Sequence, residues 1–219
     1  MDGVFVTGTG TEVGKTVAAG VIARCAADAG QRVSVFKPAV SGLDDAATDG
    51  LVPDHEHLRM AARSEQSDDE IAPYRFGPAV SPHHAAALEG SEIDAERLRA
   101  GAAAALNEGD FCVCEGVGGF LVPLRLDYLV RDFAVELGLP VVIVASPGLG
   151  TINHTLLTVE AVRGADLEVT AVVLTPWHAE PTEMEESNLE AIEELGATAV
   201  HTLCQMDPGD PATWPALAL

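Results

Sequence analysis

Lysine is almost absent from this sequence. Of the 12 Lys and Arg residues in 219, only Lys15 and Lys37 are lysines. Arginine stands at the other basic positions, and its planar guanidinium is not equivalent to an ammonium group on a phosphate. The two retained lysines therefore indicate positions where a compact point charge is required.

Positive charge of either kind is scarce. The 34 Asp and Glu residues bring the formal net charge to −22 at pH 7, and they are spread along the chain. Such a surface repels nucleic acid and anionic membranes, so we expect neither as a partner. It also repels ATP, so a nucleotide site must be locally positive. Acid excess with little lysine resembles the surface of proteins from cells with a salt-rich cytoplasm; the alternative is simply an acidic protein.

Long hydrophobic runs are also missing. No run approaches the ~18 apolar residues of a membrane span, and no signal-peptide-like stretch precedes Val4. The sequence therefore predicts a soluble cytoplasmic protein. Nothing in the middle of the chain has the composition of a linker, and 219 residues can bury one sizeable core, so we expect a single domain over residues 1–219.

Cysteine is limited to four residues, none of them in a C-x-x-C pair: Cys25, Cys112, Cys114 and Cys204. They lie mostly in apolar segments, and two of them are two apart on an expected strand. The pattern favours buried free thiols over a metal or redox site.

Apolar, β-branched runs alternate with helical patterns along the chain. Strands that are almost continuously apolar are typical of a sheet covered on both faces, and the alternation implies parallel order. The sequence predicts a doubly wound, mostly parallel α/β fold of the P-loop NTPase type. Strands are expected at 4–6, 33–36, 111–114, 141–145, 169–174 and 199–203, and helices after 14 and at 84–88, 92–107, 129–137, 151–163 and 182–195.

A glycine-rich loop follows the first expected strand. Glycines let several backbone N–H groups point at one anion, and the next helix adds its positive N-terminus. Gly8 and Gly14 enclose five residues where the P-loop consensus has four, and an ordinary turn would not explain the lysine. We predict a phosphate-binding loop formed by Gly8, Thr9, Gly10, Thr11, Glu12, Val13, Gly14, Lys15 and Thr16, with Lys15 on the β/γ-phosphates and Thr16 on Mg²⁺.

Distinctive residues also follow the other apolar runs. Ligands of a doubly wound sheet bind beyond the carboxyl ends of its strands. Lys37-Pro38 follows the second run, Glu115 and a glycine-rich stretch the third, Ser146-Pro147 the fourth and Thr175-Pro176-Trp177 the fifth. The sequence therefore predicts a single site at this edge of the sheet.

Two carboxylates are candidate Mg²⁺ ligands. Glu115 could be a helix N-cap or a solvated loop residue, but its expected position across the sheet from Thr16 favours a ligand. Asp54 begins the sequence Asp54-His55-Glu56-His57, where zinc is the alternative to a hard cation. A phosphoryl site favours oxygen ligands. His83 and His84 are expected to be loop or cap residues.

Taken together, these motifs resemble dethiobiotin synthetase. The resemblance covers about residues 3–175, including the five-residue loop spacing. It rests on Thr7-Gly8-Thr9 and Thr11 to Thr16, Lys37-Pro38 with Ser41-Gly42, Asp54, Ser81-Pro82-His83, Glu115-Gly116 with Gly118-Gly119, and Gly150-Thr151-Ile152-Asn153-His154.

The resemblance implies an enzyme that makes dethiobiotin from 7,8-diaminopelargonate, CO₂ and MgATP. The catalytic residues would be Lys37, Lys15 and Thr11, and the Mg²⁺ ligands would be Thr16, Asp54 and Glu115. The nucleotide would also contact Gly118, Thr175 and Pro176. Ser41 would face the diamine or its carbamate with Thr11 and Lys37, and Gly150, Ile152 and Asn153 would receive the substrate carboxylate across the interface of a homodimer.

Three departures from the family pattern stand out. Gly10 replaces the usual Asp of the loop, and Thr175-Pro176 replaces an Asn-Asp pair whose Asn is the expected adenine reader. The segment 204–219 lacks the usual Gly-x-x-Pro turn. The alternatives are another ATP-dependent ligase on this fold, and a non-catalytic switch or sensing module. The switch class carries a second lysine early in the loop, which is absent here.

Overall fold

A six-stranded sheet organises the molecule. The structure is a computed structural model and describes residues 2–45, 52–206 and 214–217. Every pairing within the sheet is parallel, and the strand order is β2-β3-β1-β6-β7-β8. The strands are β1 (Asp2–Gly8), β2 (Val33–Phe36), β3 (Phe111–Gly119), β6 (Val141–Ala145), β7 (Val169–Trp177) and β8 (Ala199–Cys204). This order confirms the doubly wound parallel fold.

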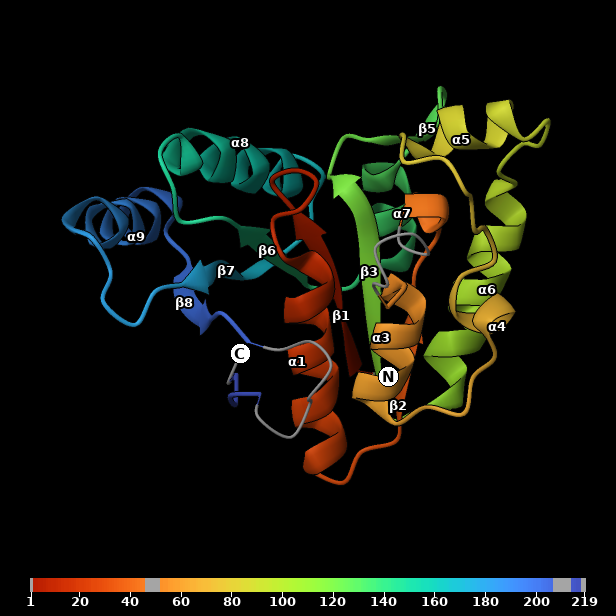
Figure 1. The fold of residues 1–219 in the computed structure, drawn as a ribbon, viewed down its shortest axis with the longest axis horizontal. Coiled ribbons are helices and arrows are strands. Elements are labelled where there is room, and N and C mark those ends of the chain that lie inside the picture. The colour runs from red at the N-terminus through yellow and green to blue at the C-terminus, as the bar shows by residue number, and fades with distance from the viewer. Residues whose placement is uncertain (1, 46–51, 207–213, 218–219) are drawn as a thin grey trace.

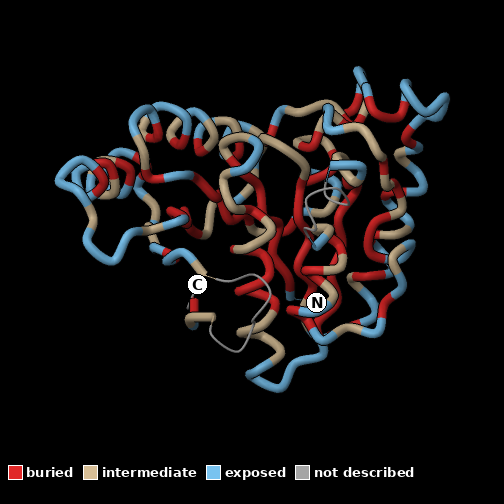
Figure 2. The backbone as a smooth tube through the Cα atoms, in the orientation of Figure 1, coloured by how far each residue is buried: buried red, intermediate tan, exposed pale blue. Residues whose placement is uncertain are grey.

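Helices cover both faces of the sheet (Figure 1). One core lies under α1 (Lys15–Asp28) and α3 (Asp54–Ala62), and the other lies under α6 (Ala95–Glu108), α7 (Val130–Leu137), α8 (Thr151–Arg163) and α9 (Glu183–Gly196). Alternation along β1 assigns Val4 and Val6 to the first core and Phe5 to the second, as the period of two in a strand requires. Figure 2 shows the buried strands between the two helical layers. Among the described residues, no helix has the length and apolar character needed to cross a membrane.

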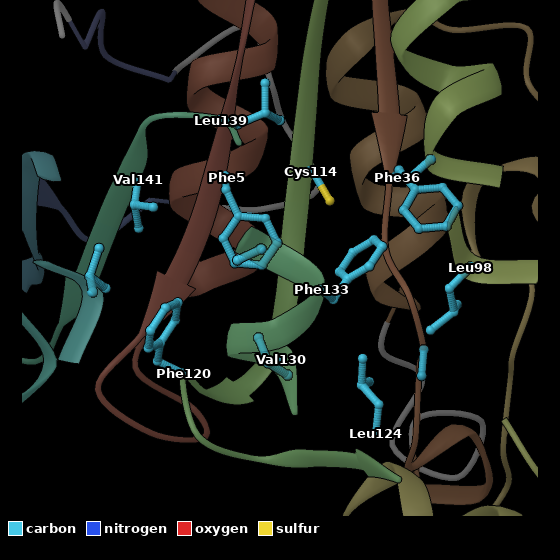
Figure 3. Close-up of a cluster of buried hydrophobic side chains, with 14 of the residues drawn as sticks. Phe5, Phe36, Leu98, Cys114, Phe120, Leu124, Val130, Phe133, Leu139 and Val141 are labelled. Atoms are coloured by element: carbon cyan, nitrogen blue, oxygen red, sulfur yellow. The ribbon is translucent and has the colours of Figure 1, made fainter. Parts of the chain in front are cut away.

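Three phenylalanines pack beneath the central strands (Figure 3). The ring centroids of Phe5 and Phe133 are 6.3 Å apart in an edge-to-face arrangement, and those of Phe36 and Phe133 are 5.9 Å apart. Such aromatic pairs add to the free energy gained from burial alone. They join β1, β2 and α7, and so fix the strands whose carboxyl ends carry the loop and Lys37.

The edge of β2 is protected by the chain that follows α3. The backbone N–H of Val35 donates to Gln66 Oε1 at 2.8 Å, and Gln66 Nε2 donates back to the Val35 carbonyl. Beyond the strand, the N–H of Lys37 donates to the Ile71 carbonyl at 2.8 Å. These bonds satisfy an otherwise open sheet edge and hold the backbone of Lys37 in place.

The structure extends two strands past their predicted ends. β3 continues to Gly119 because it pairs with β1 as far as Gly8, so Glu115 lies within the strand and not in a loop after it. β7 continues to Trp177, which pairs with Cys204. The sequence did not predict α3, α4 (Asp68–Ile71) or the antiparallel hairpin of β4 (Pro123–Arg125) and β5 (Tyr128–Leu129). Short elements of this kind carry little hydrophobic periodicity.

The thiol prediction is partly wrong. Cys112 and Cys114 are buried and share the second core, and burial raises the pKa of the Cys112 thiol to about 11. Cys25 is half-buried, and Cys204 is exposed at the end of β8. All four are free, as predicted, but Cys204 is not buried. Its exposure follows from its position on an edge strand.

Candidate active site

The site lies where the strand order reverses. β1 and β3 are neighbours, but β1 leads into α1 on one face and the chain after β3 leads into α7 on the other. Crevices of this kind at the carboxyl ends of strands bind ligands in doubly wound sheets. A cavity of about 860 Å³ opens there. Its lining is Thr11, Glu12, Gly14–Val17, Lys37, Ala39, Ser41, Gly42, Asp45, Asp54, Ala79–Pro82, Glu115, Val117, Gly118 and Val122.

The glycine-rich loop connects β1 to α1 in a conformation that depends on glycine. Gly14 has φ 90° and is the N-cap of α1. A Cβ atom at this position would lie 2.6 Å from Thr175 Cγ2, which is closer than packed atoms approach. A left-handed residue with no room for a side chain requires glycine. The first turn of α1, with its free N–H groups, therefore opens directly into the cavity.

The side chain of Lys15 reaches back across the glycine-rich loop. Its Nζ atom donates to the Gly10 carbonyl at 2.7 Å, and the residue is largely buried. Burial, followed by repulsion from Lys37, lowers the pKa of Lys15 from 10.5 to about 8, against the opposing pull of Glu115 and Asp54. The side chain is therefore a charge that an anion in the loop would stabilise.

Lys37 is buried between two carboxylates. Its Nζ atom lies 2.9 Å from Asp54 Oδ2 and also donates to Glu115 Oε1, which in turn accepts a hydrogen bond from Thr16 Oγ1 at 2.9 Å. Lys37 is 3% exposed and Glu115 is 0% exposed. Residues from β1–α1, β2, α3 and β3 thus meet within hydrogen-bonding distance.

Opposing effects set the charge states of this cluster. Burial alone would lower the pKa of Lys37, but Asp54 and Glu115 outweigh it, and the pKa is raised. Burial raises the pKa of Glu115 more than Lys37 lowers it. For Asp54, burial acts to raise the pKa, but the charge and hydrogen bond of Lys37, together with a hydrogen bond from Thr16 and the charge of Lys15, lower it overall. Lys37 remains an ammonium group that compensates the two acids.

The donor set fits a divalent hard cation. Glu115 Oε2 is buried and has no hydrogen-bond partner among the described residues. Such an atom is costly unless something else binds it. The Thr16 hydroxyl and the Asp54 carboxylate lie beside the same Lys37–Glu115 pair, and oxygen ligands of this kind are the ones Mg²⁺ prefers.

The zinc alternative at Asp54-His55-Glu56-His57 finds no support in the geometry. These residues form the start of α3, where His55 and His57 are buried and burial lowers the pKa of each. His57 stacks on Trp214 with ring centroids 4.9 Å apart. Within the described ranges, no group of three or more His, Cys, Asp or Glu side chains is placed to hold a metal.

A smaller hollow of about 450 Å³ lies on the other side of the loop. It is lined by Gly8–Thr11, the stretch Gly119–Val122, and residues of α8 that include His154 and Leu157. The predicted loop residues are thus divided between the two cavities, and Thr11 lines both.

Six predicted residues lie outside both linings: Val13, Gly150, Ile152, Asn153, Thr175 and Pro176. Gly150 is the N-cap of α8, with Ile152 and Asn153 in the first turn of that helix. Thr175 is buried and packs its methyl group over Gly14, while Pro176 is exposed. Thr175 therefore supports the loop from behind.

The sequence did not indicate one wall of the larger cavity. The backbone of Gly42–Asp44 pairs with that of Phe76–Pro78, which brings Ala79 and Val80 beside Ser41. Helix α5 (Pro82–Leu88) starts two residues earlier than predicted because a proline is well suited to the first turn. His83 and His84 lie in that first turn, next to the wall. The only signal in the sequence was Ser81-Pro82, a common helix start.

Comparison with known proteins agrees with this arrangement. A family model described as an AAA domain matches residues 2–215. The ATP-dependent dethiobiotin synthetase BioD of Anaeromyxobacter dehalogenans (strain 2CP-1) is 44% identical over 80% of this chain and 76% of its own length. BioD of Bacillus subtilis (strain 168) is 37% identical over 89% and 83% of the two chains, and BioD of Aromatoleum aromaticum is 38% identical over 95% and 92%.

The fold has a more distant structural neighbour. The MinC:MinD cell division protein complex of Aquifex aeolicus matches with a TM-score of 0.57 and 14% identity, over 94% of this chain and 82% of that one. That likeness concerns the fold alone, whereas the three relatives above share sequence over most of their length. The predicted resemblance is confirmed: this chain belongs to the family of ATP-dependent dethiobiotin synthetases.

Proposed function

We propose that this protein catalyses the ATP-dependent closure of the ureido ring of dethiobiotin from 7,8-diaminopelargonate and CO₂. Family membership supports the reaction, and one observation in the site supports its chemistry. Lys37 is a buried ammonium group that lies against the two carboxylates among the candidate metal ligands and lines the same cavity as the phosphate loop. This position supports a role for Lys37 at the point where a carbamate and a γ-phosphate would meet.

The reaction needs positioned positive charge and no protein nucleophile. One substrate amine adds to CO₂ and loses a proton to give a carbamate, and a carbamate oxygen attacks the γ-phosphorus as ADP leaves. The second amine then attacks the carbonyl carbon of the mixed anhydride and expels phosphate. Each step develops or moves negative charge, which Lys15, Lys37 and the loop N–H groups would stabilise in a preorganised site.

Mg²⁺ would be held by Thr16, Asp54 and Glu115, and when bound it neutralises charge on the β- and γ-phosphates. Asp54 and Glu115 already lie against Lys37, and Thr16 donates to Glu115. Engagement of Glu115 and Asp54 by a cation would weaken their hold on the Lys37 ammonium group. That group would then be available to an anionic substrate.

The diamine would lie between the phosphate loop and Ser41, and its carboxylate would reach the start of α8 across a homodimer interface. Exposed leucines support such an interface. Leu149 is 91% exposed directly before α8, and Leu121 and Leu157 are exposed at the rim of the smaller hollow. Large apolar side chains presented together are typical of surfaces that bind another protein.

The decisive test is incorporation of labelled CO₂ into dethiobiotin. The protein is incubated with the diamine, labelled bicarbonate, ATP and Mg²⁺, and the label in dethiobiotin is measured with each component omitted in turn. We expect incorporation that requires the diamine, ATP and Mg²⁺. ATP consumption without labelled product would overturn the proposal, and sedimentation analysis at several protein concentrations tests the homodimer.

A further inference from the structure

We infer that Asn188 is a positioning residue for recognition of the substrate carboxylate, although it lies on α9 and not at the predicted site. The inference rests on the proposed function, because it assigns the start of α8 to that carboxylate. Asn188 would act by fixing the loop between β6 and α8. No sequence motif pointed to this residue.

The observed contact joins a buried amide to two loop carbonyls. Asn188 Nδ2 donates to the Pro147 carbonyl at 2.9 Å and lies 3.4 Å from the Gly148 carbonyl. The residue is 6% exposed. Both acceptors are backbone oxygens, so only the NH₂ group of the amide serves them, and a carboxylate of the same shape would repel them.

Pro147 is buried, but the residues that follow it in the loop are less enclosed. Leu149 is 91% exposed, and a Cβ atom at Gly148 would meet nothing within 4 Å. Glycine allows many backbone conformations, so a loop with glycine on both sides of an exposed residue is costly to order. A buried amide that binds two adjacent carbonyls removes much of that freedom.

The conformation of the loop determines where α8 begins. The Gly148 carbonyl accepts from the Thr151 N–H at 3.2 Å, and Gly150 has φ 93° as the N-cap. Asn188 therefore binds the same carbonyl that closes the first turn. Ile152 and Asn153 follow in that turn, whose N–H groups have no acceptor within the helix. A shift of the loop would redirect those donors.

Helix α9 is itself firmly placed. A capping box formed by Thr182 and Glu185 starts it, with Thr182 accepting from the Glu185 N–H and Glu185 from the Thr182 N–H. Asn188 lies one turn further along. Helices α8 and α9 lie side by side on one face of the sheet (Figure 1). Asn188 thus links a fixed helix to a loop whose residues after Pro147 are little packed.

The test compares Asn188→Asp and Asn188→Ala with a matched control. Asn107→Asp removes a similar amide-to-carbonyl hydrogen bond, from Asn107 Nδ2 to the Ala103 carbonyl at 2.7 Å, on the exposed face of α6 away from the site. KM and kcat are measured for the diamine and for ATP. The same assay is run with an analogue in which a methyl group replaces the carboxylate of the diamine.

We expect KM for the diamine to rise roughly tenfold in both Asn188 variants, with KM for ATP changed less than about twofold, as loss of one or two hydrogen bonds predicts. The analogue should react equally well with the wild type and the variants, because it has no carboxylate to position. Asn107→Asp should match the wild type. Equal losses with the analogue, or a rise in KM for ATP of the same size, would overturn the inference in favour of a general packing role.

Hydrogen exchange separates this inference from the proposed function. The amides of the loop and first turn, 146–153, should exchange faster in Asn188→Asp than in the wild type. Unchanged exchange would overturn the anchoring role. If the wild type formed no dethiobiotin, the proposed reaction would fail and the substrate role with it, whereas faster exchange in the variant would still establish the anchor.

Discussion

Lys37 and Glu115 form a buried ion pair between the end of β2 and the middle of β3, 78 residues apart in sequence. Lys37 is 3% exposed and Glu115 is 0% exposed, so neither charge has water to solvate it. Buried charges persist only when they are paired, and removal of one partner is far more costly than removal of both. The pair therefore contributes to the stability of the sheet at the candidate active site.

Lys37→Gln should abolish ring formation while MgATP still binds. The lost charge lies where the carbamate and γ-phosphate would meet, and removal of such a group typically costs about 3 kcal/mol or more of transition-state stabilisation. The measurement is turnover at saturating substrates, with ATP binding followed by calorimetry. Near-normal turnover would remove Lys37 from the mechanism.

The same variant provides a stability control. Without Mg²⁺, Lys37→Gln should lower the free energy of unfolding by about 3 kcal/mol or more, because Glu115 remains buried and unpaired. The double variant Lys37→Gln/Glu115→Gln should be more stable than Lys37→Gln alone. Additive losses in urea unfolding would mean that the two side chains do not interact.

The sequence predicted those parts of the molecule that are determined locally. The apolar runs at 33–36 and 141–145 match the structure residue for residue, because strands buried on both faces are mostly apolar. The helix at 151–163 also matches, because its buried residues recur at helical spacing. Helix α3 carried no such signal, since His55 and His57 are buried polar residues and its contact with α1 depends on the small Gly20.

The site was predicted as a set of residues but not as a geometry. Gly14, Lys15 and Thr16 were recognisable from their spacing, and their positions in the loop follow from it. The contact of Lys37 with Asp54 and Glu115 is non-local and follows only from the strand order. Thr175 was expected to contact the nucleotide near its adenine base. In the structure, the parallel register of β7 places the Thr175 methyl group behind Gly14.

Gly10→Asp should fold normally and bind the diamine more tightly. A Cβ atom at Gly10 would have Val13 Cγ1 as its nearest neighbour at 4.0 Å, so the loop has room for the side chain usual in the family. A carboxylate there would attract the cationic diamine across the loop. We expect KM for the diamine to fall with a small change in melting temperature, whereas the uncharged Gly10→Asn should not lower KM. A rise in KM would show that this loop is adapted to glycine.

Nucleotide binding should weaken as the pH rises above about 8. Burial lowers the pKa of Lys15 to about 8 from an ordinary 10.5, so the folded protein without ligand loses this charge while the unfolded chain keeps it. Between these two values the unfolded state binds more protons, and this group makes the free energy of unfolding rise with pH. Bound phosphate favours the charged form, so binding in the same window should take up a proton.

Calorimetry in buffers of different ionisation enthalpy measures that proton uptake and Kd together. Lys15→Arg is the control, because arginine stays protonated throughout the range and should flatten the pH dependence even where it weakens binding. A constant Kd from pH 7 to about 9.5, with no proton uptake, would contradict the assignment of Lys15 to the phosphates.

Nucleotide choice should be looser than adenine-specific. Thr175 has one hydroxyl in place of the donor and acceptor pair of an Asn amide, and it is buried behind Gly14. Phosphate and metal contacts do not distinguish bases, so kcat/KM for ATP, CTP and GTP should agree within about one order of magnitude. A preference for ATP of about a thousandfold would mean that another residue reads adenine. Thr175→Ser keeps the hydroxyl and should leave base preference unchanged.

Stability and activity should require molar salt. At a net charge of −22, folding brings carboxylates together that the unfolded chain keeps apart, and 12 Lys and Arg residues cannot compensate 34 acids by pairing. Most of the arginines already form ion pairs, as in Arg32 with Asp110 and Arg24 with Asp28, so few cations remain for the excess acids. Salt screens that repulsion, because the Debye length falls from about 10 Å at 0.1 M to about 3 Å at 1 M.

Screening alone saturates near molar salt, but exclusion of salt from apolar surface continues to favour burial. The melting temperature should therefore keep rising with KCl beyond that point. The same salt weakens the attraction between exposed cations and phosphate. Lys15 and Lys37 should retain their attraction for phosphate, because both are buried in the cavity wall. Activity should rise with stability instead of falling. Equal melting temperature and turnover in dilute buffer and in molar KCl would show that the acidic surface is not an adaptation to salt.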